Sequence, residues 1–408
     1  MQTTYNFDKT VDRRGTNALK VDALQARYGA ADLIPLWVAD MDFETPPFIV
    51  DALKARMEHP IFGYTQIPQG YWPSIIGWME EMHGWRVKQE WLCYIPGIVT
   101  GIGLALNVFT EAGDKIIIQP PVYHPFRLVP EANGRTIAYN PLRLANDRYE
   151  MDFEQLERLI DDRCKLLILA NPHNPGGVVW SRETLQQLAD ICARHRLTVI
   201  ADEIHADMAL YGNRHVPFAS VSEAAAQGSI TFNAPSKTFN IAGLKSSFAV
   251  VPNAALRARF YSWLRANELN EPSIPAIIAT EAAYTHGREW LRQMLLYVEG
   301  NVEYVAQFLS SHIPAIRVMR PQASFLVWLD CRKLGLGHAA LVDLFVNRAK
   351  LALNDGEMFG PGGEGFMRLN VGTPRSTLER AMKQLEEVVH ITTSFAKMAP
   401  TECSKTIS

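Results

Sequence analysis

Short apolar segments alternate with helical patterns through the middle of this chain, and this alternation is the feature that most constrains its fold. The apolar segments cover 115–119, 165–170, 197–201, 229–232 and 247–251. Apolar strands separated by helices are typical of a mostly parallel sheet that helices cover on both faces. In such α/β sheets, ligands bind at the carboxyl ends of the strands. Polar residues that follow these strands are therefore the candidates for a functional site.

The pattern changes after about residue 285. Here we expect helices over 281–310, with a break near Gly287, and over 338–348, strands over 324–330 and 366–371, and a last helix that Ser376 caps and that runs to about Val389. In the N-terminal part we expect a strand over 33–43, a helix that Thr45 caps and that ends near Met57, and a helix over 71–83. We expect a large domain over 46–285, a small α+β domain made of 1–45 and 286–395, and a flexible tail over 396–408.

Composition excludes several classes of protein. The 408 residues carry a formal net charge of −3, without the basic face that nucleic-acid binding needs. The five cysteines are odd in number and widely spaced, which indicates reduced thiols and neither a disulfide framework nor a zinc site. No apolar stretch reaches membrane-spanning length, and the polar residues 1–12 lack a secretory signal. We expect a cytoplasmic protein that binds no metal, membrane or nucleic acid.

The stretch 233–245 follows one of the apolar strands and contains Lys237 between two hydroxyl residues, Ser236 and Thr238, with a second cation at Lys245. Partial desolvation lowers the pKa of a lysine and frees its neutral amine to form a Schiff base with an aldehyde. The hydroxyls and the second lysine are suited to bind phosphate. Pyridoxal 5′-phosphate is an aldehyde that carries its own phosphate, so Lys237 is a candidate anchor for it. An exposed loop with two ordinary lysines is the alternative.

Polar residues follow two other strands as well. A buried Asp202, after 197–201, would keep a pyridine nitrogen protonated, although an aspartate here also commonly caps a helix. Asn174 lies in a rigid N-P-H-N-P motif, which either points its amide into a cleft or is only a turn. Tyr123 follows 115–119 after two prolines, and its ring either covers a pyridine face or packs in the core.

Three further features have both a functional and an ordinary interpretation. The helix that opens at 97–101 leaves backbone amides free to bind phosphate, or its glycine is only a cap. Tyr64 is either a ligand contact or a packed loop aromatic. Arg368 lies between apolar residues on a strand of the second lobe, where its planar fork suits a substrate carboxylate or else faces solvent.

In their order along the chain, these motifs resemble the class I/II aminotransferase superfamily, the fold type I group of pyridoxal-phosphate enzymes. They are Tyr64, Pro96-Gly97, Pro121-x-Tyr123, Asn171-Pro172-x-Asn174-Pro175, Asp202-Glu203-Ile204, Ser236-Lys237-Thr238, Lys245 and Arg368. Within that superfamily, residues 37–43 (WVADMDF), 202–207 (DEIHAD) and 236–244 (SKTFNIAGL) are similar to the branch of cystathionine β-lyases and related C–S lyases. The resemblance implies an α/β fold whose large domain holds a mostly parallel seven-stranded sheet between helices.

The resemblance also implies a role for each matching residue. Lys237 is the Schiff-base lysine and proton shuttle, Asp202 pairs with the ring nitrogen, Asn174 donates to the ring oxygen O3′, and Tyr123 stacks on the ring. The amides of Val99 and Thr100, with Ser236 and Lys245, hold the phosphate, and Tyr64 reaches the phosphate of the neighbouring subunit in a homodimer. Arg368 binds the substrate carboxylate, with Asn174, Trp37, Val38 and Ala39 as further substrate contacts.

Two departures from transaminases favour a lyase. His205, a candidate cofactor contact, stands where transaminases usually carry a tyrosine, and residues 37–40 replace their glycine-rich substrate turn. We therefore expect α,β-elimination of cystathionine, cysteine or related S-substituted L-cysteines to a thiol, pyruvate and ammonia. Aminotransfer from an L-amino acid is the first alternative, and a lyase fold with an added regulatory protein-binding role is the second.

Overall fold

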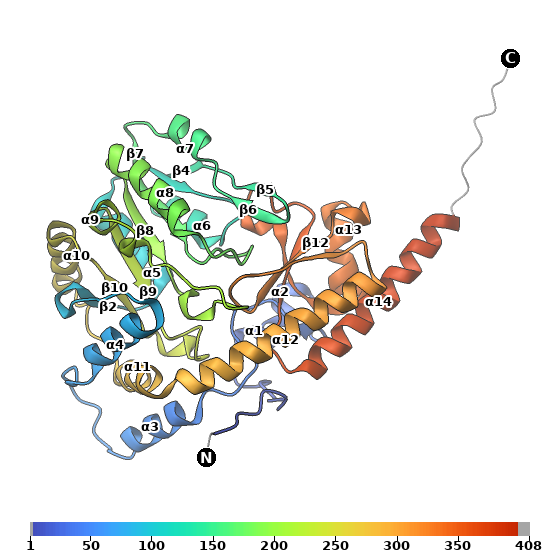
Figure 1. Ribbon diagram of the computed structural model, residues 1–408. Coiled ribbons are helices and arrows are strands. Elements are labelled where there is room, and N and C mark those ends of the chain that lie inside the picture. The colour runs from blue at the N-terminus through green and yellow to red at the C-terminus, as the bar shows by residue number, and fades with distance from the viewer. Residues whose placement is uncertain (1–2, 399–408) are drawn as a thin grey trace.

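The computed structural model describes residues 3–398, with side chains up to residue 389. Its centre is a seven-stranded sheet in the order β2-β10-β9-β8-β7-β3-β4 (Figure 1). The strands are β2 (Leu92–Ile95), β3 (Lys115–Ile118), β4 (Thr136–Tyr139), β7 (Cys164–Ala170), β8 (Thr198–Asp202), β9 (Ser229–Asn233) and β10 (Ser247–Val250). β9, β8, β7, β3 and β4 are parallel to one another, whereas β10 is antiparallel to both β9 and β2. The predicted mostly parallel seven-stranded sheet is confirmed, although the sequence patterns had not located β2 and β4.

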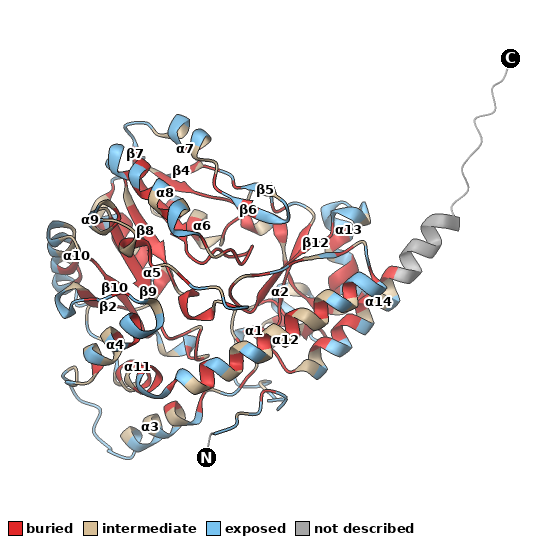
Figure 2. Ribbon diagram, in the orientation of Figure 1, coloured by how far each residue is buried: buried red, intermediate tan, exposed pale blue. Residues whose placement is uncertain are grey.

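Both faces of this sheet are buried, which explains its nearly continuous apolar strands. Along β7, Leu166 and Ile168 join one apolar cluster, whereas Leu167 and Leu169 join another. Successive side chains of a strand point to opposite faces, so the two clusters lie on the two sides of the sheet. Figure 2 shows the central strands as buried along their length.

Helices cover the two faces. The helices whose side chains join the first cluster are α5 (Ile98–Phe109), α6 (Pro125–Ala132) and α10 (Ala254–Ala266). Those that join the second are α7 (Phe153–Leu159), α8 (Arg182–Arg194) and α9 (Glu223–Gln227). Ser181 is the N-cap of α8, and its side chain accepts the backbone N–H of Thr184. At one edge of the sheet, α11 (Ile274–His286) packs against both α3 (Pro47–Met57) and α4 (Tyr71–His83).

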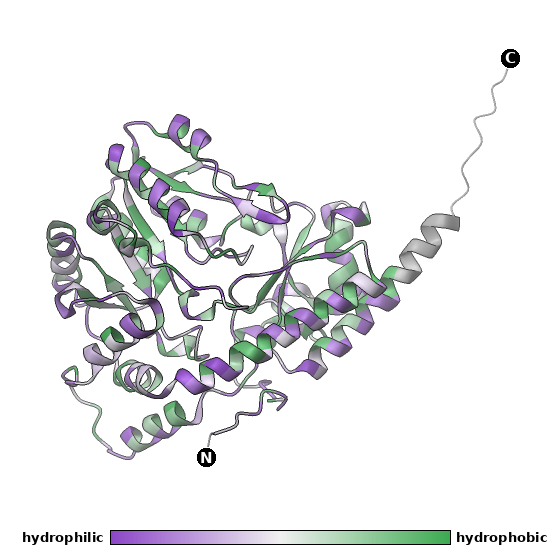
Figure 3. Cartoon of the chain, viewed as in Figure 1, coloured by the Kyte–Doolittle hydropathy of each residue, from purple (hydrophilic) through white to green (hydrophobic). Residues whose placement is uncertain are grey.

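The C-terminal part forms a second, four-stranded antiparallel sheet in the order β11-β12-β15-β14. Its strands are β11 (Arg317–Met319), β12 (Leu326–Asp330), β14 (Asn354–Asp355) and β15 (Phe366–Asn370), and its helices are α12 (Arg288–His312), α13 (His338–Asp343), the π-helix η6 (Leu344–Arg348) and α14 (Arg375–Met398). α12 and α14 pack side by side, and both show alternating apolar and polar stripes in Figure 3. The break at Gly287 between α11 and α12 is confirmed.

The N-terminal arm reaches this second sheet region. It carries two short helices, α1 (Leu19–Asp22) and α2 (Leu24–Tyr28), and the strand β1 (Ile34–Pro35), which pairs in parallel with β13 (Leu351–Ala352). A separate hairpin consists of β5 (Arg143–Ala145) and β6 (Arg148–Glu150). The proposed domain limits at 46–285 stay a prediction.

Three expectations about local structure were wrong. The strand expected over 33–43 ends at Pro35, because the carbonyls of residues 37–41 accept hydrogen bonds from side chains and not from a neighbouring strand. Thr45 does not cap α3, since its hydroxyl donates instead to Asn240 O at 3.3 Å. Ser376 lies inside α14, which runs past Val389 to Met398, and residues 399–408 of the expected tail lie outside the described residues.

Candidate active site

A cavity of about 260 Å³ lies at the carboxyl ends of β7, β8 and β9. Ten of the predicted site residues line it: Ala39, Val99, Thr100, Tyr123, Asn174, Asp202, His205, Ser236, Lys237 and Lys245. They come from segments far apart in the sequence, and the parallel strands bring these segments to one edge of the sheet. Four other predicted residues, Trp37, Val38, Tyr64 and Arg368, do not line this cavity.

Lys237 follows β9 and turns its amine into the cavity. Its Nζ donates to Ala39 O at 2.5 Å. Burial lowers the pKa of this amine to about 8; the cations Arg368 and Lys20 act in the same direction, whereas Asp40 and Asp202 oppose them. A lysine with this pKa is partly neutral near pH 8, and its lone pair is then free to attack an aldehyde.

Asp202 is the last residue of β8, and its carboxylate is buried. Its Oδ1 accepts the backbone N–H of Ile204 at 3.1 Å. Burial raises the pKa of Asp202 to about 7, and the nearby Lys237 opposes this shift. A cationic N–H group placed against this carboxylate would stabilise its charged form, because it would replace the water that burial removes.

His205 lies three residues after Asp202 and is also buried. Burial lowers the pKa of its imidazole to about 3, with Lys237 and Arg368 adding to the effect, so the ring is neutral. Its Nδ1 has no hydrogen-bond partner among the described residues. A buried polar atom without a partner is rare in proteins, and it marks a place where a ligand can donate or accept.

Arg368 lies on β15 behind the cavity, and its guanidinium is buried. Nη1 donates to Asn174 Oδ1 at 3.1 Å, and Nη2 donates to Asn354 Oδ1 at 2.7 Å and to Trp37 O at 3.0 Å. Its Cζ also lies 5.0 Å from the centre of the Phe359 ring. Burial lowers the pKa of Arg368 to about 10, so it stays charged at neutral pH. These partners are neutral, which leaves the cation available for a carboxylate ligand.

One part of the cavity lining, made of residues 99–100, Ser236 and Lys245, suits a phosphate group. Val99 and Thr100 lie in the first turn of α5, whose free backbone amides and dipole favour an anion. Gly97 precedes this helix with a φ of +134°, a conformation that favours glycine. Ser236 and Lys245 line the same cavity with a hydroxyl and an ammonium.

The residues present therefore fit pyridoxal 5′-phosphate. The amine of Lys237 suits its aldehyde, and the buried carboxylate of Asp202 suits its ring nitrogen. The partnerless nitrogen of His205 and the ring of Tyr123 lie in the same cavity, together with the phosphate-binding set.

Three of the predicted residues lie outside the cavity of their own chain. Tyr64 is fully exposed and lies outside the cavity of its own chain. The indole of Trp37 donates to Lys20 O at 2.9 Å, whereas the Trp37 carbonyl accepts from Arg368 Nη2 at 3.0 Å. The carbonyl of Val38 accepts from Asn370 Nδ2 at 2.6 Å.

Sequence reasoning missed the polar network behind the cavity. Asp207 is buried and accepts from Trp78 Nε1 at 2.9 Å and from Thr238 Oγ1 at 2.8 Å, and it lies 2.8 Å from His83 Nε2. Beside it, Glu203 Oε2 lies 3.0 Å from His215 Nε2. The run DEIHAD contains both acids, but nothing in the sequence indicates which histidines they meet. Asn354 was missed as well, because its strand β14 has only two residues.

A profile of the family described as aminotransferase class I and II matches residues 31–385. Cystathionine beta-lyase PatB from Bacillus subtilis (strain 168) is 45% identical over 382 residues, which cover 93% of this chain and 99% of that protein.

Two solved structures are similar as well. Cystalysin from Treponema denticola, whose crystal structure contains a pyridoxal 5′-phosphate cofactor, superimposes with a TM-score of 0.92 at 32% identity over 96% of this chain and 100% of that chain. A C–S lyase from Staphylococcus hominis, also bound to the cofactor, has a TM-score of 0.88 at 32% identity over 95% of this chain and 98% of that chain.

Proposed function

The chain belongs to the class I and II aminotransferase family, and we propose that its cavity catalyses α,β-elimination of S-substituted L-cysteines such as cystathionine. It is a pyridoxal 5′-phosphate-dependent carbon–sulfur β-lyase. One molecule of water enters the overall reaction, and the products are a thiol, pyruvate and ammonia. The observation that carries this proposal is the placement of a buried Lys237 amine and a buried Asp202 carboxylate in one cavity.

When bound, the cofactor supplies an aldehyde that takes up an amino group and a ring that withdraws electrons from the substrate Cα. Asp202 holds a proton at the ring nitrogen, because its buried carboxylate gains most from a cationic partner. Arg368 binds the α-carboxylate of the substrate through its guanidinium, next to Asn174.

Lys237 removes the proton from the substrate Cα. Its lowered pKa suits a general base at neutral pH, and Ala39 O orients its amine. The thiolate then leaves from Cβ and takes up a proton. The imidazole of His205 is neutral. It therefore adds no positive charge that would oppose protonation of Lys237 Nζ when this amine takes up the proton from Cα.

A coupled pyruvate assay tests this function. Purified enzyme given L-cystathionine should release pyruvate without any keto acid, and Lys237→Ala should lose both this activity and the visible absorption of the lysine-bound cofactor. Formation of glutamate from added 2-oxoglutarate, without release of pyruvate, would instead assign the cavity to aminotransfer.

We also propose that the enzyme is a homodimer in which Tyr64 binds the cofactor phosphate of the partner subunit. Support comes from its full exposure and from the neighbouring exposed apolar residues Ile61 and Phe62, which are typical of an interface.

A cytoplasmic location is supported by the buried, free thiols of Cys93, Cys164, Cys192 and Cys331. Among the described residues, no helix combines the length and apolarity needed to cross a membrane.

A further inference from the structure

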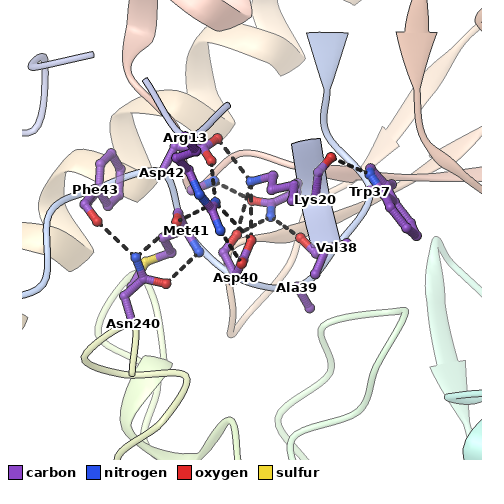
Figure 4. Close-up of polar contacts among 12 residues, drawn as sticks. Arg13, Lys20, Trp37, Val38, Ala39, Asp40, Met41, Asp42, Phe43 and Asn240 are labelled. Carbon is purple, nitrogen blue, oxygen red and sulfur yellow. Dashed lines mark hydrogen bonds and ion pairs between the residues drawn. The ribbon is translucent and has the colours of Figure 1, made fainter. Parts of the chain in front are cut away.

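Two cations of the N-terminal arm meet two carboxylates of the segment 37–43 (Figure 4). Arg13 Nη2 lies 2.7 Å from Asp40 Oδ2, and its Nη1 lies 2.9 Å from Asp42 Oδ1. Lys20 Nζ lies 2.9 Å from Asp42 Oδ2 and donates to Asp40 O at 3.0 Å. We call these four residues the arm cluster. It joins the arm to the segment that enters the catalytic cavity at Ala39.

The burial of Lys20 makes the arm cluster unusual. Its side chain has no exposed surface, whereas Asp40 and Asp42 are about one-fifth exposed. An ammonium taken out of water is destabilising unless paired charges and hydrogen bonds replace its hydration. Such pairs add little net stability compared with apolar residues, but they fix one arrangement of the groups that they join. The arrangement fixed here is that of residues 40–42 against the arm.

The segment that the arm cluster holds separates two hollows. Ala39 lines the catalytic cavity, and residues 40–45 line an open hollow of about 890 Å³ beside the arm. Met41 is fully buried, but residues 38–40 are only partly buried, so side-chain packing alone does not fix them. Asn370 also helps to fix residues 38–40, because its Nδ2 donates to Val38 O at 2.6 Å and to Asp40 O at 2.7 Å.

We propose that Arg13 and Lys20 are positioning residues that hold the Ala39 carbonyl against the Lys237 amine. The inference rests on the function proposed above. In the described part of the chain, Ala39 O is the hydrogen-bond acceptor found for Lys237 Nζ. Lys20 and Asp40 also influence the charge state of this amine, in opposite directions.

Displacement of the segment 37–43 would act on two parts of the reaction, the binding of the substrate carboxylate and the removal of its α-proton. Different residues carry these two parts. Arg368 also donates to Asn174 and Asn354, which lie outside the segment 37–43, so we expect the carboxylate site to survive a displacement of the Trp37 carbonyl. Loss of the arm cluster is therefore expected to disorient the base and to leave substrate binding nearly intact. The effect should fall on kcat and not on KM.

Lys20→Met in the full-length holoenzyme is the first test. We expect kcat for cystathionine to fall by about 10- to 100-fold, because a displacement of about 1 Å costs up to about 100-fold, with KM nearly unchanged. The kinetic isotope effect of α-deuterated substrate should rise, since proton removal is the slowed step. Lys9→Met is the matched control: Lys9 lies on the same arm in an exposed ion pair with Glu44, and it should behave as wild type.

A second readout does not depend on activity. Hydrogen exchange of the coenzyme-free protein should be faster at residues 36–43 in Lys20→Met, with no change at 198–202. Arg13→Lys is the milder variant in case Lys20→Met does not fold; it keeps the charge but loses the fork across Asp40 and Asp42.

The inference is overturned if kcat and the isotope effect stay at wild-type values, or if KM rises alone. Unchanged exchange at 36–43 would overturn it as well. If the wild-type enzyme itself releases no pyruvate, the proposed function fails separately, and the exchange rates still decide whether the arm cluster holds the segment.

Discussion

Thr238 Oγ1 donates to Asp207 Oδ2 at 2.8 Å, one residue beyond Lys237. Asp207 thereby connects the loop of the catalytic lysine to α4, whose Trp78 and His83 meet its other oxygen. Burial alone would raise the pKa of Asp207. The contacts with His83, Trp78 and Thr238 outweigh this effect, so the pKa of Asp207 lies below its ordinary value. The base is therefore held from behind by a buried anion that does not itself line the cavity.

Asp207→Asn should destabilise the protein by about 2–4 kcal/mol, because the amide nitrogen cannot accept the bonds that a carboxylate oxygen accepts. Urea denaturation checks this value. Asp190→Asn on α8 is the control, since this exposed side chain accepts only from Gln186 among the described residues, and its stability should change by less than about 0.5 kcal/mol. Equal stability of the two variants would contradict the role of Asp207.

The contribution of Asp202 to the stability of the coenzyme-free protein should fall as the pH rises from about 5 to about 7. Asp202 has a pKa of about 7 when folded and 3.8 as a free side chain, so in this range the folded state holds the proton that the unfolded state has released. Ionisation of Asp202 therefore favours unfolding, by about 2 kcal/mol over the interval, whereas the buried histidines His124, His173 and His205, whose pKa values burial lowers, act in the opposite direction.

Asp202→Asn is the control for this titration. It removes the ionisable group, so the difference in unfolding free energy between wild type and variant should shrink or reverse as the pH falls. Lys237 does not interfere, because its pKa of about 8 lies above the interval. A pH-independent difference between the two proteins would show that Asp202 is not protonated in the folded state.

Arg368→Lys should raise KM far more than it lowers kcat. A lysine keeps the charge but cannot contact both carboxylate oxygens through a planar fork, and kcat/KM should fall by about 100-fold. Arg332→Lys serves as the comparison, because Arg332 follows β12 of the same sheet, is about half exposed and pairs with Asp330, the last residue of that strand. A similar loss in both variants would indicate a general defect of the sheet.

Mixing two inactive variants tests the proposed homodimer. If Tyr64 acts in the partner's site, a heterodimer of Tyr64→Ala and Lys237→Ala contains one site with both residues intact. Refolding the two variants together should restore up to roughly a quarter of wild-type activity, for random pairing into dimers. Restored activity should be absent when each variant is refolded alone. No recovery in a mixture that forms dimers would place Tyr64 outside the neighbouring site.

Five strands of the central sheet, β3, β7, β8, β9 and β10, were predictable because they are largely apolar on both faces and because each is followed by a turn signal, whereas β2 and β4 were not located. The cavity followed from the same logic: residues at the ends of parallel strands, such as Asn174 and Asp202, must meet at one edge. These features depend on local pattern and on topology, which a single sequence carries.

Tertiary contacts explain what the sequence did not reveal. The segment 37–43 has the composition of a strand, but Asn370 and Arg368 occupy its carbonyls, so it cannot pair along its length. Lys20 looks like any helix lysine, and only the fold shows that it is buried against Asp42. Such long-range partners leave no periodic signal.

The reversed direction of β10 has a mechanical consequence. Because the chain returns directly from β9 into β10, Lys237 and Lys245 lie on the same connecting loop. A cofactor bound through its aldehyde to Lys237 and through its phosphate to Lys245 would connect two points of this loop. Binding of the cofactor should therefore make the loop more rigid, and its loss should make the loop more mobile.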